Sequence, residues 1–90
     1  MKSRLQKDED ICYLCGKYMT SKNMHHILNG AYKAKCEADR LVCFVHPTCH
    51  RYIHDHAMTA RTLKQRAQKC FEKEIGTRKE FISRYGKNYL

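Results

Sequence analysis

The stretch that decides the fold runs from Leu41 to His54 and reads LVCFVHPTCHRYIH. Its first five residues are apolar and rich in β-branched side chains, which favours a buried β-strand. Pro47 then suits the first turn of a helix, where the N–H that proline lacks would have no partner in any case. We therefore predict a strand that passes through a short knuckle into a helix ending near Met58.

This knuckle and a second one nearer the N-terminus predict a structural zinc site. Two residues separate Cys12 from Cys15, and two residues separate His46 from Cys49. Three sulfurs and one imidazole make the closed tetrahedral set typical of structural Zn²⁺. Two alternatives stay open: Cys43 replaces His46 as the fourth ligand, or the first pair are ordinary or redox-active thiols.

A second set of histidines remains once this zinc is assigned. His50 and His54 are four residues apart on the predicted helix, so their imidazoles share one face, as paired metal ligands require. His25 and His26 lie on or beside a short predicted strand, where adjacent side chains point in opposite directions. One of the two can therefore complete a metal site with three protein ligands and open positions, which suits catalysis. We interpret His56, which lies off that helix face, as a surface residue.

The rest of the chain is predicted to be mostly helical. A helix that opens at Thr59 or Thr62 carries apolar side chains along one face and ends at Gly76. A capping box at residues 77–80 starts a short last helix, which Gly86 ends. Apart from Cys43, the alternative zinc ligand, two cysteines lie outside both sets: we expect Cys36 in a loop and Cys70 in the core.

These elements predict an α+β fold, a small zinc-stabilised, treble-clef-like ββα finger with additional C-terminal helices. We divide the chain into a flexible N-terminal arm (1–10), the ββα region (11–58) and a helical extension (59–90) packed on the same domain. A chain of 90 residues buries a small core and is expected to need a metal or a partner for stability.

Charge and hydropathy narrow the classes of function. Eighteen Lys and Arg against nine Asp and Glu give a net charge of +9, which favours a polyanionic partner, nucleic acid by default. No apolar run approaches the about 20 residues of a membrane span. The first residues, MKSRLQKD, lack the apolar region of a secretory signal. We expect a cytoplasmic protein with reduced thiols and no membrane partner.

The order of the motifs resembles that of the HNH endonucleases, also called ββα-metal nucleases. The resemblance covers about residues 11–58: a Cys-x-x-Cys knuckle, the triplet His25–Ile27, and a second knuckle that continues into the helix histidines. The C-terminal sequence FISRYGKNYL at 81–90 is similar to small phage-encoded members of the family. The resemblance implies a ββα-metal fold and, for a phage protein, action in the host cytoplasm.

The resemblance also implies a role for each matched histidine. His25, His50 and His54 would hold a catalytic divalent metal, and His26 would be the general base that takes a proton from water. The implied reaction is hydrolysis of DNA phosphodiester bonds, by nicking or full cleavage, to 5′-phosphate and 3′-hydroxyl ends. The metal would be Mg²⁺, Mn²⁺, Ni²⁺, Co²⁺ or Zn²⁺, and three imidazoles favour the transition metals.

The chain departs from the family pattern at the middle letter of HNH. Leu41 stands where the asparagine is expected, and Asp39 is the candidate substitute for its role in bracing the loop between the strands. Arg51, next to His50, is the best candidate for a phosphate contact, and we expect DNA binding through the backbone without strong sequence preference. The protein would act as a monomer or a dimer.

A different class of function also stays open. The same zinc finger can serve as a binding module that holds DNA or protein without cutting, and the missing asparagine supports it. The spare histidine set supports the nuclease, because a binder needs one metal and the nuclease needs two. A redox or disulfide protein is the third class.

Overall fold

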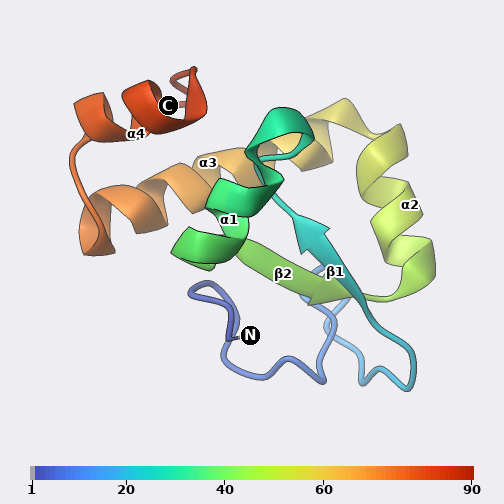
Figure 1. Ribbon diagram of the computed structural model, residues 1–90. Helices are drawn as coiled ribbons and strands as arrows, with labels where there is room; N and C mark the ends of the chain where they lie inside the picture. The colour runs from blue at the N-terminus through green and yellow to red at the C-terminus, as the bar shows by residue number, and fades with distance from the viewer. Residues whose placement is uncertain (1) are drawn as a thin grey trace.

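Two short antiparallel strands form the sheet at the centre of the fold (Figure 1). Strand β1 (Asn23–His26) pairs with β2 (Val42–Val45), and His25 lies opposite Cys43 in the register. The computed structural model describes residues 2–90. A two-stranded sheet and four α-helices make this a small α+β protein, as predicted.

A helix joins the two strands where the sequence predicted a loop. The 3₁₀ turn η1 (Gly30–Tyr32) leads into α1 (Lys33–Asp39). The helix ends at Arg40, whose left-handed backbone (φ 58°) lets its N–H reach back to the carbonyls of the last turn. Cys36, which we expected in a loop, is fully buried in α1, and its thiol donates to the carbonyl of Leu28 at 2.9 Å.

The next two helices follow one another almost without a break. Helix α2 (Pro47–Asp55) begins at the proline, as predicted, and ends before Met58. Helix α3 (Ala57–Glu74) begins two residues before Thr59, the earlier of the two predicted starts. Only His56, in an extended conformation (φ −126°), separates the helices, so the chain turns there within a single residue.

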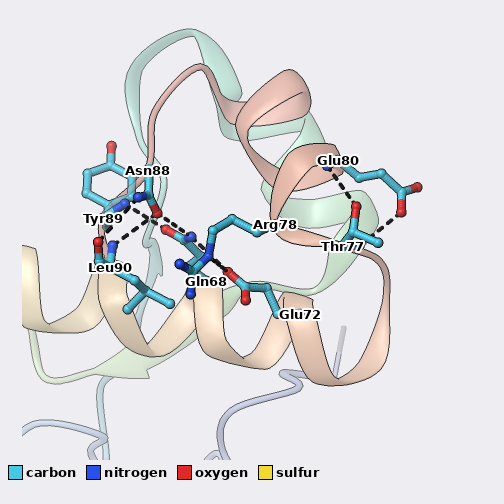
Figure 2. Close-up of polar contacts among 8 residues, drawn as sticks. All are labelled: Gln68, Glu72, Thr77, Arg78, Glu80, Asn88, Tyr89 and Leu90. Atoms are coloured by element: carbon cyan, nitrogen blue, oxygen red, sulfur yellow. Dashed lines mark hydrogen bonds and ion pairs between the residues drawn. The ribbon is translucent and has the colours of Figure 1, made fainter.

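The last helix and the C-terminal tail pack onto α3 (Figure 2). Helix α4 (Arg78–Tyr85) begins with the predicted capping box: the Thr77 hydroxyl accepts from the N–H of Glu80 at 3.1 Å, and the Glu80 carboxylate accepts from the N–H of Thr77 at 2.9 Å. Gly86, with φ 77°, ends the helix, also as predicted. Phe71, Phe81 and Tyr85 form an aromatic cluster between α3 and α4.

A buried glutamine fixes the tail that follows α4. Gln68 on α3 is fully buried, and its amide nitrogen donates to the side-chain oxygen of Asn88 at 2.8 Å. Its amide oxygen accepts from the N–H of Tyr89 at 2.7 Å (Figure 2). Both ends of one side-chain amide are thus satisfied by the tail, which accounts for the burial of so polar a residue.

The N-terminal segment lies along the outer edge of β2 and contains no helix or strand between residue 2 and residue 10. Gln6 acts there as a substitute for a third strand: its side chain accepts from the N–H of Phe44 at 2.7 Å and donates to the carbonyl of Phe44 at 3.1 Å. The hydroxyl of Ser3, which is also buried, donates to the carbonyl of Val42. The sequence predicted a flexible arm here, and these buried contacts place it against the sheet.

The described helices differ from membrane spans. Among residues 2–90, none of them combines the length and the apolar character that crossing a bilayer would need.

Candidate metal centres

The first candidate metal centre joins two segments far apart in the sequence. Cys12 and Cys15 come from the turn that precedes β1, whereas His46 and Cys49 come from the start of α2. The four ligand atoms all lie within 4.8 Å of one another. The Cys15 sulfur is 3.3 Å from Nδ1 of His46, and the Cys49 sulfur is 4.0 Å from the same atom. This Cys₃His cluster, predicted from the two knuckle spacings, can hold a structural metal such as zinc.

Backbone hydrogen bonds shape the two knuckles. The N–H of Gly16 donates to the carbonyl of Cys12 at 2.9 Å, and Gly16 adopts the left-handed φ of 77° that this tight turn requires. The N–H of Cys12 in turn donates to the carbonyl of Lys17 at 2.8 Å. On the other side, the N–H of His50 donates to the carbonyl of His46 at 2.8 Å, which starts α2 directly after the knuckle.

The ionisation of the thiols indicates what the Cys₃His cluster can bind. Burial opposes ionisation of Cys12, but hydrogen bonds with backbone groups, first that of Cys15, outweigh it and lower the pKa to about 6. Burial, followed by the hydrogen bond and charge of Cys12, raises the pKa of Cys49 to about 12. Several negative sulfurs can lie this close only with a compensating cation. A thiophilic divalent metal supplies that charge, so the donor set fits Zn²⁺.

The other cysteines lie apart from this cluster. Cys43, the alternative fourth ligand, is fully buried in β2, and burial raises the pKa of its thiol to about 12. The described cluster is complete in three sulfurs and one imidazole without it. Cys70 is buried on α3, in the core position that the sequence predicted.

The second candidate metal centre is a group of three imidazoles on β1 and α2. The ring centroid of His25 lies 5.1 Å from that of His50 and 5.6 Å from that of His54. The Nε2 atoms of the two helix histidines are 3.2 Å apart, and the ligand atoms of all three residues lie within 4.8 Å of one another. Helical spacing and the register of β1 thus bring together the histidines that the sequence grouped.

Burial favours the neutral form of two members of this triad, His25 and His50. His25 is 3% exposed, and its burial, followed by the proximity of His50 and His54, lowers its pKa to about 4. Burial also lowers the pKa of His50. Neutral imidazole is the form that binds metal. Three nitrogens fit a borderline transition metal, and such a set leaves coordination positions open.

An asparagine that sequence reasoning missed supports this triad. The side-chain amide of Asn23 lies 3.3 Å from Nδ1 of His50, which directs Nε2 of that ring toward His54. Outer contacts of this kind orient metal-binding histidines. The available signal was the period of two in a strand, because Asn23 and His25 share one face of β1.

His26 lies in the same pocket as the triad and has a different partner. The pocket has a volume of about 260 Å³ and is lined by side chains from β1, α1, α2 and the turn before η1, namely Met24, His25, His26, Asn29, Lys33, His50 and His54. Nε2 of His26 lies 3.0 Å from a carboxylate oxygen of Glu37 on α1. Arg51, the predicted phosphate contact, is exposed on α2 outside this lining, and Lys33 is the basic residue within it.

Leu41 and Asp39, the two residues considered for the role of an asparagine, serve the fold. Leu41 is fully buried in the core. Asp39, the candidate substitute for asparagine, accepts hydrogen bonds from Arg84 at 2.6 Å and from the Tyr85 hydroxyl at 2.5 Å. It therefore braces the end of α1 against α4 and takes no part in lining the histidine pocket.

Comparisons with known proteins bring no relative: no protein-family model, no curated protein and no solved structure matches this chain. The two clusters and the pocket beside the second one are the features of this chain that indicate a function.

Proposed function

We propose that this chain is a metal-dependent DNA endonuclease of the HNH type, built on a ββα-metal fold. The observation that carries the proposal is the second cluster: His25, His50 and His54 lie beside a fourth histidine in one pocket. A purely structural zinc protein needs only the closed Cys₃His set. Three imidazoles around open coordination positions suit a metal that also contacts a substrate.

In this proposal the four pocket histidines divide into ligands and base. The triad of His25, His50 and His54 holds the divalent metal, which when bound neutralises charge on the scissile phosphate and the departing oxygen. His26, on the wall of the same pocket, takes a proton from the attacking water. The new bond joins the water oxygen to phosphorus, and the bond from phosphorus to the 3′ oxygen breaks. The departing oxygen takes up a proton from solvent, so the products carry 5′-phosphate and 3′-hydroxyl ends.

The charge of the chain supports DNA as the substrate. The net charge is +9, Lys33 lines the pocket, and Arg51 lies exposed on α2. Such residues contact phosphates and give affinity without sequence preference, and this affinity falls steeply with salt. We place the activity in the cytoplasm, where thiols stay reduced, because three of the cysteines belong to the Cys₃His cluster.

A plasmid-nicking assay tests the proposal. Wild-type protein and His26→Ala are compared in Mg²⁺, Mn²⁺, Ni²⁺, Co²⁺ and Zn²⁺, after zinc loading of the Cys₃His set. We expect nicking by the wild type to depend on the added metal and to fall about 10²- to 10⁴-fold in His26→Ala. His56→Ala is the matched control, because that imidazole stacks on Tyr52 with ring centroids 3.7 Å apart and lies outside the pocket lining.

Metal content gives a second readout. The proposal expects two metals per chain in the wild type and one in a His50→Ala, His54→Ala double variant, measured by elemental mass spectrometry. If no metal supports nicking while both wild type and His26→Ala still shift DNA on a gel, the endonuclease proposal fails. The zinc-stabilised binding module then takes its place.

A further inference from the structure

We propose that Glu37 is a positioning residue that holds His26 in the orientation and tautomer of a general base. This inference rests on the proposed endonuclease function. Its direct observation is one contact between two elements: Oε2 of Glu37 on α1 lies 3.0 Å from Nε2 of His26 on β1. Sequence reasoning placed no helix here and assigned Glu37 no role.

The contact selects one of the two neutral forms of the imidazole. An ionised carboxylate only accepts hydrogen bonds, so it favours the tautomer of His26 that carries its hydrogen on Nε2. The lone pair then lies on Nδ1, which no group among residues 2–90 engages in a hydrogen bond. Nδ1 is therefore the atom that can take a proton from water. The carboxylate of Glu37 also stabilises the imidazolium that forms, as the acid of a catalytic triad does.

The four pocket histidines differ in their contacts in a way that matches their proposed roles as metal ligands or base. His25, His50 and His54 lie against one another, and among the described residues none of them pairs with a carboxylate. His26 alone has such a partner, in Glu37. A metal ligand must stay neutral, whereas a base must become charged during the reaction. The one carboxylate therefore lies beside the one histidine that has to accept a proton.

The backbone of α1 is fixed on both sides of Glu37. The preceding Cys36 is fully buried, its thiol donates to the carbonyl of Leu28 and its sulfur accepts from the N–H of the same residue at 3.3 Å. Two residues later, Asp39 is held by Arg84 through two hydrogen bonds. Glu37 thus reaches His26 from an anchored helix, which a positioning role requires.

The first test reads the tautomer directly and needs no activity. Long-range ¹H–¹⁵N spectra of the zinc-loaded protein at about pH 8.5, where ordinary imidazoles are neutral, report which ring nitrogen carries hydrogen. We expect His26 to hold its hydrogen on Nε2 in the wild type and to become a mixture of tautomers in Glu37→Ala. Glu74→Ala is the matched control, since it removes the same charge from an exposed pair with Arg4.

The second test separates positioning from binding. In the nicking assay, Glu37→Ala should lower kcat about 10- to 100-fold, part of what the base itself contributes, while KM and metal content stay as in the wild type. Glu37→Gln keeps an acceptor without the charge, so its kcat should lie between that of the wild type and that of Glu37→Ala. In a His26→Ala background the effect of Glu37→Ala should vanish, because no base remains to be positioned.

The outcomes distinguish failure of the proposed role of Glu37 from failure of the proposed endonuclease function. If the wild type nicks DNA and Glu37→Ala nicks equally well, the role of Glu37 is refuted and the endonuclease stands. An unchanged His26 tautomer in Glu37→Ala refutes it as well. If the wild type does not nick DNA in the presence of any of the metals tested, the endonuclease proposal fails, and the base role of His26 fails with it. Far-ultraviolet circular dichroism and zinc content verify that each variant is folded.

Discussion

Replacing Asp39 with alanine should loosen the junction between α1 and α4. The side chain of Asp39 is 12% exposed and accepts three hydrogen bonds: two from Arg84, at 2.6 and 3.1 Å, and one from the Tyr85 hydroxyl at 2.5 Å. Burial, followed by the hydrogen bond to Asp39, raises the pKa of Tyr85, so this hydroxyl is a donor throughout the stable pH range. The alanine variant deprives all three donors of their acceptor.

The loss of stability follows from the exposure of the two residues that donate to Asp39, Tyr85 and Arg84. Tyr85 is 1% exposed, and a buried hydroxyl left without a partner costs roughly 1–3 kcal/mol. The side chain of Arg84 is 36% exposed, so water replaces much of the lost pair and its share is only about 1 kcal/mol. We expect Asp39→Ala to lower the free energy of unfolding by roughly 2–4 kcal/mol, a large part of a small domain's stability.

Urea unfolding of the zinc-loaded protein, followed by circular dichroism, measures this loss. Tyr85→Phe in the Asp39→Ala background removes the stranded hydroxyl, so the double variant should be more stable than additivity predicts by about 1–2 kcal/mol. Asp10→Ala is the control: its carboxylate is 60% exposed in a pair with Lys22, and its loss should cost at most about 0.5 kcal/mol. An Asp39→Ala variant as stable as this control, or a strictly additive double variant, would refute the reasoning.

Three further predictions concern the cap, the metal and a buried thiol. Thr77→Ala should cost about 1 kcal/mol in urea unfolding through loss of the α4 cap. Since hydrogen bonds with Thr77 hold the pKa of Glu80 below its ordinary 4.5, the contribution of the capping box is present above that pH and is lost as the pH falls below it. A scan of Tm against pH should therefore be flatter in Glu80→Gln, which has no carboxylate to titrate. Removing metal with a strong chelator should unfold the knuckle region, with the loss of circular dichroism reversed by added Zn²⁺ and not by Mg²⁺. Burial raises the pKa of Cys36 to about 11, so iodoacetamide at pH 8 should leave this thiol unlabelled in the folded protein and label it in urea, as mass spectrometry would detect.

Short sequence signals correctly predicted three of the secondary-structure elements, β2, α2 and α4. The apolar run before Pro47 indicated β2, proline at the first turn indicated the start of α2, and the box at residues 77–80 indicated α4. Helix α1 has no such signal, because Cys36 is its only buried residue and no apolar period marks its face. The contacts of Gln6 were equally hidden, since a polar side chain that pairs with a strand edge looks like a solvent-exposed residue.

The candidate site was also predictable only in part from the sequence. The members of both clusters could be chosen from spacing, because knuckles and helical turns fix distances between residues close in the chain. The side chains that contact these histidines from other elements could not be chosen in this way. Asn23 meets His50 only through the packing of β1 on α2, and Glu37 meets His26 only because a helix occupies the connection between the strands.

A single peptide bond links the two candidate centres, because Cys49 belongs to the Cys₃His cluster and the next residue, His50, belongs to the triad. A metal held by Cys49 would fix the first turn of α2, and with it the direction from which His50 points into the second candidate centre. Occupancy of the two centres should then be cooperative. By thermodynamic reciprocity, the factor by which the first metal tightens binding of the second equals the factor by which the second tightens the first. If both centres hold metal as proposed, a shortage of zinc would also lower occupancy of the second centre, without any change in the supply of that metal.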